Sequence, residues 1–205
     1  LLYNLNIAKE FARKKNNLLI CEGYMDIISL NQNGIYSTVA PLGTALTEDQ
    51  LQLAWKYSNK PTIMFDGDNS GFRAAYKTAL LSLPFLSPNN FLQFIKLPQG
   101  YDPDTYIRNF SVHKLIELLK SPLSISDFIF EQSSSTIDLT IADNKISYDK
   151  YLDDIIETIK DKKIKYFYKN EFKNLFFQKL KFKNKTINII NSKNVNHLLD
   201  KQINS

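Results

Sequence analysis

The stretch from Thr62 to Gly71 constrains the fold of this chain more than any other. The apolar run Thr62–Phe65 is typical of a short buried strand, and it ends in the acidic turn Asp66-Gly67-Asp68. In open α/β sheets, ligands gather at the carboxyl ends of the strands, where this turn lies. Two carboxylates that face one point repel each other unless a cation lies between them, so the turn suits a hard cation such as Mg²⁺. The alternative is an ordinary solvated turn, in which Asp, Gly, Asn and Ser are common.

An alternation of predicted strands and helices runs through residues 1–97. Apolar runs at 18–21, 37–40 and 91–97 are typical of further strands. A helical pattern at 5–15 precedes the first strand. Further helical patterns lie between the strands, and they cover 24–33, the stretch that follows the capping box at Thr47, and 72–83. This order predicts an α/β fold with a mostly parallel four-stranded sheet and helices on both faces. After residue 98 the patterns are helical, which predicts an α-helical subdomain.

Composition places the chain among globular proteins, with 43% hydrophobic and 23% charged residues. No apolar run approaches the roughly 20 residues that span a membrane, so we expect no membrane partner. The only cysteine is Cys21, and the two histidines, His113 and His197, are distant in sequence. This usage argues against a disulfide framework and against a zinc site in this piece, and it suits a reducing cytoplasm. We expect Cys21 to be a packed strand residue.

Positive charge is concentrated late in the chain. Residues 160–193 contain eleven lysines and two acidic residues, whereas the whole chain has a net charge of +5. A basic arm beside an acidic metal-binding core is typical of nucleic-acid enzymes. The equally open alternative is a compositional bias of an AT-rich genome, since Lys, Asn and Ile are abundant throughout.

Acidic residues follow two of the predicted strands. Glu22 follows the first strand, and Asp66 and Asp68 follow the third, so a parallel sheet would bring all three to one edge. Asp26 lies one helical turn after Glu22 and can reach the same pocket or stabilise the first turn of its own helix. A glutamate crowded by aspartates has a raised pKa, so Glu22 is also a candidate general acid or base.

Two further candidate segments follow the other strands. Asp102 and Asp104 lie just beyond the fourth strand and can form another cation site. The alternative is structural, because Asp102 also suits an N-cap with Pro103 as the first helical residue. Gly43 and Thr44 follow the second strand, where a glycine turn either offers N–H groups to a phosphate or is a simple turn.

Four of these segments together resemble the bacterial replicative DNA primases over about residues 1–182. The segments are Glu22-Gly23-Tyr24-Met25-Asp26, Leu42-Gly43-Thr44-Ala45-Leu46-Thr47, Asp66-Gly67-Asp68 followed by Gly71 and Ala74-Ala75, and Asp102-Pro103-Asp104. The Glu-Gly pair alone, or the Asp-x-Asp motif alone, would be weak evidence for this resemblance. The acidic segments also resemble the Toprim module of type IA and type II topoisomerases, but the Tyr-Met-Asp and Leu-Gly-Thr segments are similar to primases.

The resemblance implies a Toprim, or Rossmann-like, sheet within an RNA polymerase domain. It implies that Glu22, Asp66 and Asp68 hold catalytic Mg²⁺, for which Mn²⁺ can substitute, and that Glu22 and Asp66 are catalytic. A second implied group, which holds further metal with the incoming nucleotide, is Asp26, Asp102 and Asp104. The implied domains are the end of a preceding polymerase subdomain at 1–15, the Toprim domain at 16–98, a metal-binding loop and helical subdomain at 99–182, and a linker or tail at 183–205.

The resemblance also implies a function. A primase makes short RNA primers from NTPs on a single-stranded DNA template for replication, by metal-dependent nucleotidyl transfer, and works with a replicative helicase. The family's zinc-binding domain, the basic half of its polymerase domain and its helicase-binding domain have no counterpart here. The first residue is Leu1, so we expect a piece of a longer protein that is a poor primase alone.

Two rival functions remain open from the sequence. One is a topoisomerase-type Toprim enzyme that cleaves DNA through one of the eleven tyrosines. The other is a non-catalytic Toprim-like scaffold that binds DNA or a partner, with its acidic residues merely solvated. Covalent protein–DNA adducts would identify the first rival, and metal affinity independent of Asp66 and Asp68 would identify the second.

Overall fold

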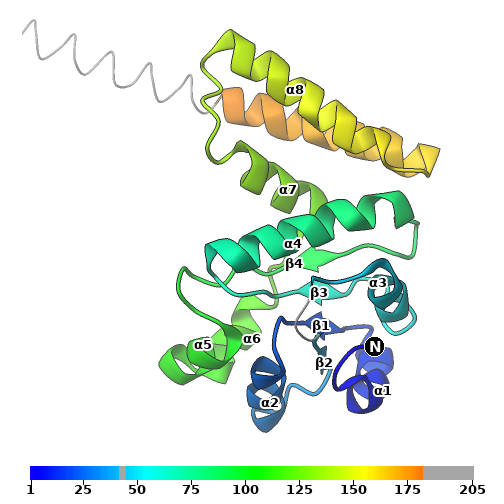
Figure 1. Cartoon of the computed structure of the whole chain (residues 1–205), viewed down its shortest axis with the longest axis vertical. Coiled ribbons are helices and arrows are strands. Elements are labelled where there is room, and N and C mark those ends of the chain that lie inside the picture. The colour runs from blue at the N-terminus through cyan, green and yellow to red at the C-terminus, as the bar shows by residue number, and fades with distance from the viewer. Residues whose placement is uncertain (42–44, 182–205) are drawn as a thin grey trace, which may run out of the picture.

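The computed structural model describes residues 1–41 and 45–181 of the chain. In this part of the chain five short strands form one sheet in the order β2-β1-β3-β4-β5 (Figure 1). The strands are β1 Leu19–Ile20, β2 Thr38–Val39, β3 Thr62–Ile63, β4 Gln93–Phe94 and β5 Leu123–Ser124. The predicted tail at 183–205 and the predicted phosphate-binding residues Gly43 and Thr44 lie outside the described residues.

The first four strands are parallel, as predicted from the alternation of strands and helices. β1 pairs with both β2 and β3, and β3 pairs with β4. The fifth strand was not predicted: β5 runs antiparallel to β4, with Leu123 opposite Phe94. Two residues are too few to show the alternating pattern that identifies a strand in a sequence.

Several of the helices begin at residues whose side chains cap the first turn. Thr47 and Gln50 form the predicted capping box, with the Gln50 N–H donating to Thr47 Oγ1 (3.3 Å). Asp68 caps the next helix, which therefore begins at Asn69 and not at the predicted residue 72. The helices are α1 Leu5–Lys15, α2 Tyr24–Gln32, α3 Glu48–Trp55, α4 Asn69–Ser82, α5 Pro103–Phe110, α6 Val112–Leu118, α7 Ile125–Ser134, α8 Ala142–Glu157 and a final helix over 162–181, with a short 3₁₀ turn at Leu83–Phe85.

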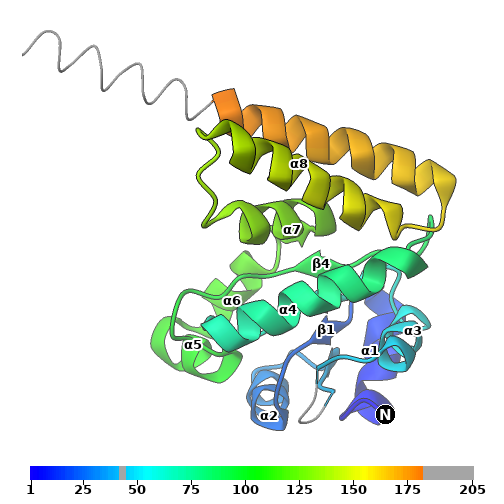
Figure 2. The same cartoon turned by 45° about the horizontal axis from the view of Figure 1, so that its top comes forward.

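The sheet is buried between two layers of helices (Figure 2). Successive strand residues point to opposite faces. Leu19 and Cys21 pack in the cluster that includes α2, α5 and α6, whereas Ile20 and Ile63 pack in the cluster that includes α1, α3 and α4. Burial of each such side chain contributes roughly 1.5–3 kcal/mol, so continuous apolar strands specify a sheet covered on both faces. Cys21 is buried, as expected of a packed strand residue.

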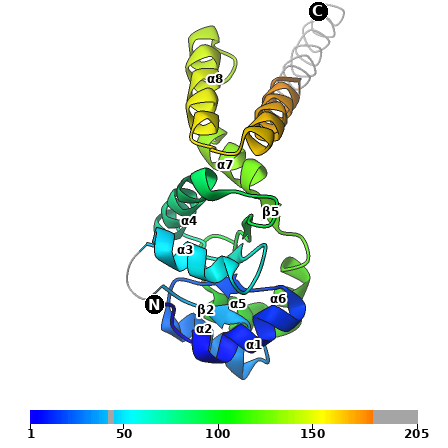
Figure 3. The ribbon, with the colours of Figure 1, turned by 90° about the vertical axis from the view of Figure 1, so that its right-hand side faces the viewer.

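The helical part continues the core on the α4 side of the sheet. The Phe94 ring of β4 stacks on the Phe128 ring of α7, with centroids 4.2 Å apart. Tyr148 of α8 and Phe172 of the final helix belong to the same buried cluster. Figure 3 shows α8 and the final helix beyond α7, at the far end of the molecule from β2. Among the described residues no helix is both long and apolar enough to cross a membrane.

Candidate metal centre

The structure places Glu22 and Asp66 next to each other. They follow β1 and β3, which are adjacent and parallel, with Leu19 opposite Thr62. The backbone N–H of Asp66 donates a hydrogen bond to Glu22 Oε1 at 3.1 Å. The parallel register therefore joins two residues that are 44 positions apart in the sequence. We call the acidic residues at this end of the sheet, Glu22, Asp26, Asp66, Asp68, Asp102 and Asp104, the carboxylate edge.

Gly71 makes room for the Glu22 carboxylate against the first turn of α4. A Cβ atom at position 71 would lie 2.7 Å from Glu22 Oε1 and 2.2 Å from the carbonyl oxygen of Asp66. Any larger side chain would push one of these groups away. This glycine therefore fixes where Glu22 lies relative to Asp66.

Gly67 joins the two acidic loops of the carboxylate edge. Its N–H donates to the Tyr101 carbonyl oxygen (2.8 Å), and its own carbonyl oxygen accepts from the Gly100 N–H (2.9 Å). A Cβ atom here would lie 2.1 Å from the Pro98 carbonyl oxygen. The close approach that Gly67 permits is therefore made by the neighbouring loop. The loop of Asp66 is thereby fixed to the loop that leads to Asp102.

Asp66 is the most electrostatically unfavourable residue of the carboxylate edge. Its Oδ1 atom is buried and has no hydrogen-bond partner. Burial, and after it the negative charges of Glu22, Asp26, Asp102 and Asp68, together raise the pKa of Asp66 to about 7. Asp66 Oδ1 therefore lacks both contact with solvent and a hydrogen-bond partner among the described residues.

Asp26 and Glu22 show the same electrostatic pattern. Burial raises the pKa of Asp26 to about 6, with smaller contributions from the charges of Asp102, Glu22 and Asp104, while a hydrogen bond from the Gly23 N–H at 3.1 Å lowers it. The pKa of Glu22 is also raised, first by burial, whereas the Asp66 N–H lowers it. Burial, and not crowding by aspartates, is thus the main cause of the shift expected at Glu22.

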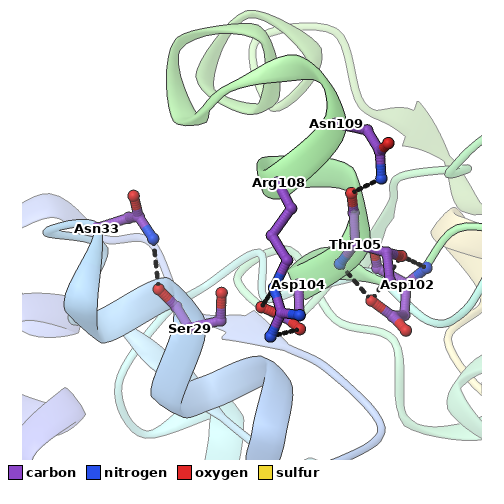
Figure 4. Close-up of polar contacts among 7 residues, drawn as sticks. All are labelled: Ser29, Asn33, Asp102, Asp104, Thr105, Arg108 and Asn109. Atoms are coloured by element: carbon purple, nitrogen blue, oxygen red, sulfur yellow. Dashed lines mark hydrogen bonds and ion pairs between the residues drawn. The ribbon is translucent and has the colours of Figure 1, made fainter.

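Asp68 and Asp102 each cap a helix. Asp68 is exposed, and its Oδ1 accepts from the Gly71 N–H at 2.7 Å. Asp102 Oδ1 accepts from the Thr105 N–H (2.6 Å) and from Thr105 Oγ1 (2.8 Å), as Figure 4 shows. In both residues only Oδ1 takes part in these hydrogen bonds. A helix cap and a metal ligand are therefore compatible roles at Asp68 and Asp102.

Asp104 has a partner that the sequence interpretation missed. The Arg108 guanidinium forms an ion pair with it, with Nη2–Oδ2 at 2.7 Å and Nε–Oδ1 at 3.1 Å (Figure 4). The i, i+4 spacing on one helix was the available signal. Figure 4 shows this pair facing the α2 segment that carries Ser29. Both oxygens of Asp104 are occupied, unlike those of Asp102.

The donor set suits a hard divalent cation. Carboxylate oxygens are the ligands that Mg²⁺ prefers, and a cation would supply the missing counter-charge at Asp66 Oδ1. As the side chains lie, no three Asp, Glu, His or Cys residues in 1–41 and 45–181 are close enough together to hold an ion. Glu22 and Asp68 use one oxygen each in the hydrogen bonds described above, so the second oxygen of each can turn toward a cation.

Several lysines of the basic stretch contact other helices. Lys165 pairs with Glu157 (3.2 Å), and Lys169 pairs with Asp153 (3.4 Å) of α8. Lys179 donates to the Ser134 carbonyl oxygen at 3.1 Å. These three lysines hold the final helix against α7 and α8, so part of the local charge has a structural use. Contact of the stretch with nucleic acid stays a prediction.

Comparisons with known proteins identify the sheet and its acidic loops. A family model described as Toprim-like matches residues 19–107. The chain is 33% identical to the DNA primase of Rickettsia prowazekii over 187 residues, which is 91% of this chain and 32% of that protein. This chain therefore spans about a third of the length of that relative.

Solved structures extend the similarity to the helical part. The Escherichia coli primase catalytic core superposes with a TM-score of 0.77 at 30% identity, over 85% of this chain and 56% of that one. A DnaG primase catalytic domain bound to single-stranded DNA gives 0.76 at 31% identity, over 84% of this chain and 56% of that one. This chain belongs to the bacterial DNA primase family and corresponds to the Toprim-containing part of its catalytic core.

Proposed function

We propose that the carboxylate edge is the Mg²⁺ site of a primase-type nucleotidyltransferase, which makes RNA primers from NTPs. The observation that carries the proposal is the buried, unpartnered Oδ1 of Asp66 beside Glu22. A half-buried carboxylate with a buried oxygen that has no partner destabilises the fold unless a cation or a proton neutralises it. A loss of folding stability of this kind is expected at a functional site. The unpartnered carboxylate oxygen contributes nothing to the stability of the fold.

Glu22, Asp66 and Asp68 are the proposed first group of metal ligands. Gly71 positions the Glu22 carboxylate, and the Gly67 hydrogen bonds position the loop of Asp66 and Asp68. When bound, Mg²⁺ stabilises the charge on the attacking and leaving oxygens of the transferred phosphoryl group. The chain's own residues then hold the attacking and leaving oxygens in a fixed arrangement. This role requires rigid loops more than reactive side chains.

Asp26, Asp102 and Asp104 are the proposed second group, beside the incoming nucleotide. The charges of Asp102 and Asp104 both raise the pKa of Asp26, which supports a shared location. Asp104 differs from the other two because Arg108 occupies both of its oxygens. We expect Asp104 to act only after Arg108 turns to another partner, such as a phosphate of the nucleotide.

The proposed substrates follow from the relatives. The similar DnaG catalytic domain is bound to single-stranded DNA, and we extend this partner, with NTPs and the RNA primer, to this chain. A replicative helicase is proposed on the family resemblance alone. Since the chain spans about a third of its relative, primer synthesis is tested best within that relative.

The test is a chimera in which this chain replaces the matching part of the R. prowazekii primase. We expect incorporation of labelled NTPs on single-stranded DNA with Mg²⁺, at least about 100-fold lower with Asp66→Asn and unchanged with Asp154→Asn, an exposed acidic residue of α8. A folded chimera that is inactive, or one that keeps its activity with Asp66→Asn, would contradict the proposal. Covalent protein–DNA adducts would support the topoisomerase alternative instead.

A further inference from the structure

A pocket separate from the carboxylate edge lies between the Toprim sheet and the helical part. It has a volume of about 710 Å³ and is formed by α4, α8 and the residues at and after the end of α7. We call it the aromatic pocket, because its walls include Phe72, Tyr76, Tyr148 and Tyr151. None of the six acidic residues of the carboxylate edge lines it.

Two helices line the aromatic pocket with matching stripes. The residues from α4 run from Asn69 to Tyr76 at positions i, i+3, i+4 and i+7, and those from α8 run from Asn144 to Tyr151 at the same spacing. Residues with this spacing share one face of a helix. Figures 1 and 2 show α4 and α8 running in the same direction. The two asparagines therefore lie toward one end of the pocket and the two tyrosines toward the other.

The tyrosine end is closed by hydrogen bonds among its own hydroxyl groups. Tyr76 and Tyr151 share a hydrogen bond between α4 and α8, and Tyr148 shares one with Ser133 Oγ at 2.8 Å. Burial raises the pKa of Tyr148 to about 12 and raises that of Tyr76 as well, so both groups stay neutral. With these hydroxyls occupied, the partly exposed side chains of Phe72, Tyr76 and Tyr151 form the aromatic wall that a ligand can reach, whereas Tyr148 is only 2% exposed.

The other end carries a cation. Arg73 is exposed, and it is the only charged residue among the described residues that line the pocket. Its Nε donates to the Asn69 carbonyl oxygen at 3.0 Å, which orients the side chain along the first turn of α4. Arg73 takes part in none of the ion pairs among the described residues, so the terminal nitrogens of its guanidinium can bind a phosphate in a bidentate manner.

We propose that the aromatic pocket binds a nucleotide, with the base among the aromatic rings and the phosphate on Arg73. Its volume lies within the range of about 300–1,000 Å³ typical of small-molecule sites. Aromatic rings stack on any base, and a pocket whose lining includes Arg73 and no carboxylate selects for an anion. The Gln132 amide and Asn144 Oδ1 can supply polar contacts for the base or the sugar, while Asn144 Nδ2 donates to the Asp138 carbonyl oxygen at 2.9 Å. This inference does not depend on the proposed metal function.

The direct test uses 5′-GMP as the probe and isothermal titration of the whole chain, with EDTA present to remove divalent cations. Arg73→Gln should weaken GMP binding about tenfold and leave guanosine binding unchanged, because it removes only the phosphate contact. Ser147→Trp should abolish the binding of both, because the indole fills the pocket. The matched control is Lys77→Gln, which removes an exposed cation of the same helix outside the pocket and should change neither affinity.

The variants also separate this site from the carboxylate edge. Asp66→Asn should leave GMP affinity unchanged in EDTA. If Asp66→Asn alters GMP binding and Ser147→Trp does not, the nucleotide binds at the carboxylate edge and the inference is wrong. It is equally wrong if the wild-type chain shows no GMP binding, or if Arg73→Gln and Lys77→Gln have equal effects. Thermal melting of each variant excludes unfolding as the cause.

The nucleotide can be a free monophosphate or one residue of a strand. Competition between GMP and a short single-stranded oligodeoxynucleotide distinguishes the two sources. Displacement of GMP by the oligonucleotide in the wild type, together with weaker oligonucleotide binding by Ser147→Trp, would identify a strand contact. Retention of GMP in the presence of the bound oligonucleotide would identify a site for free nucleotide. Either result supports a nucleotide site, because both require GMP to occupy the pocket.

Discussion

The carboxylate edge and the aromatic pocket lie on either side of the start of α4, yet they are built in opposite ways. At the edge, buried carboxylates repel each other and Asp66 Oδ1 has no partner. In the pocket, Tyr76, Tyr148 and Tyr151 satisfy their hydroxyls within the protein. The edge therefore reduces stability until a ligand neutralises it, whereas the pocket exists at no electrostatic cost. Helix α4 therefore adjoins one site with unfavourable electrostatics and one site whose tyrosine hydroxyl groups are hydrogen-bonded.

The largest expected effect comes from the backbone that holds the edge together. Gly67→Ala places a Cβ atom 2.1 Å from the Pro98 carbonyl oxygen, so the two loops must separate. We expect a loss of at least about 3 kcal/mol in the free energy of unfolding, measured in urea. Gly23→Ala is the control, since its Cβ would meet only a side-chain oxygen at 3.4 Å, and it should cost about 1 kcal/mol or less. Equal effects would mean that the contact between the loops does not matter.

The second effect is a dependence of stability on pH that belongs to the edge alone. The pKa of Asp66 is about 7 in the folded chain against an ordinary value of 3.8, so between these values the folded state binds the extra proton. Stability in EDTA should therefore fall as the pH rises through this range and level off above about 7. Asp26, with a pKa of about 6, contributes in the same direction.

Asp66→Asn removes the main part of this dependence. Near pH 8 in EDTA the variant should melt several degrees above the wild type, because it lacks the buried charge. Its melting temperature should also change less between pH 5 and pH 8. Asp154→Asn, an exposed residue of α8, serves as the control and should follow the wild type. A lower melting temperature for Asp66→Asn near pH 8 would show that the charge is already neutralised within the fold.

The third effect tests whether the hydrogen bond between tyrosine hydroxyls in the aromatic pocket stabilises the fold. Tyr76→Phe and Tyr151→Phe each remove one partner of the hydroxyl pair between α4 and α8, and each should cost about 1 kcal/mol. The double variant should cost less than the sum of the two, because both changes break the same hydrogen bond. Tyr166→Phe, in an exposed position of the final helix, should be neutral. Additive costs would argue against the bond.

The smallest effect concerns the exposed ion pair at Asp104. Arg108→Gln should change the free energy of unfolding by less than about 0.5 kcal/mol, because Arg108 is 69% exposed. The same variant should strengthen Mn²⁺ binding if Asp104 belongs to the second group of ligands, since it frees both carboxylate oxygens. A large loss of stability, or weaker Mn²⁺ binding, would assign Asp104 a purely structural role.

The sequence predicted the carboxylate edge better than the pocket for a physical reason. The acidic residues follow short motifs at strand ends, and parallel pairing then brings Glu22 to Asp66 without further information. The sequence interpretation missed the approach of the neighbouring loop to Gly67 and the pair between Arg108 and Asp104. The approach to Gly67 depends on tertiary packing, while the pair was visible in the i, i+4 spacing.

The aromatic pocket and β5 depend on packing between distant segments. The stripe from Asn69 to Tyr76 has the spacing of an ordinary buried helix face, and only the position of α8 opposite it leaves a hollow. Strand β5 pairs with β4 through two residues, too few to show a period. By contrast, helix α1 has the predicted bounds of residues 5–15, because its pattern and its ends are local.

The central claim is that a divalent cation relieves the unfavourable charge at Asp66. The most direct measurement is isothermal titration of Mn²⁺ into the wild-type chain, Asp66→Asn and Asp154→Asn at one pH near 8. We predict a defined binding step in the wild type and in Asp154→Asn, and a loss of at least about tenfold in affinity for Asp66→Asn. Equal affinity in all three proteins would contradict the assignment of the carboxylate edge as the metal centre.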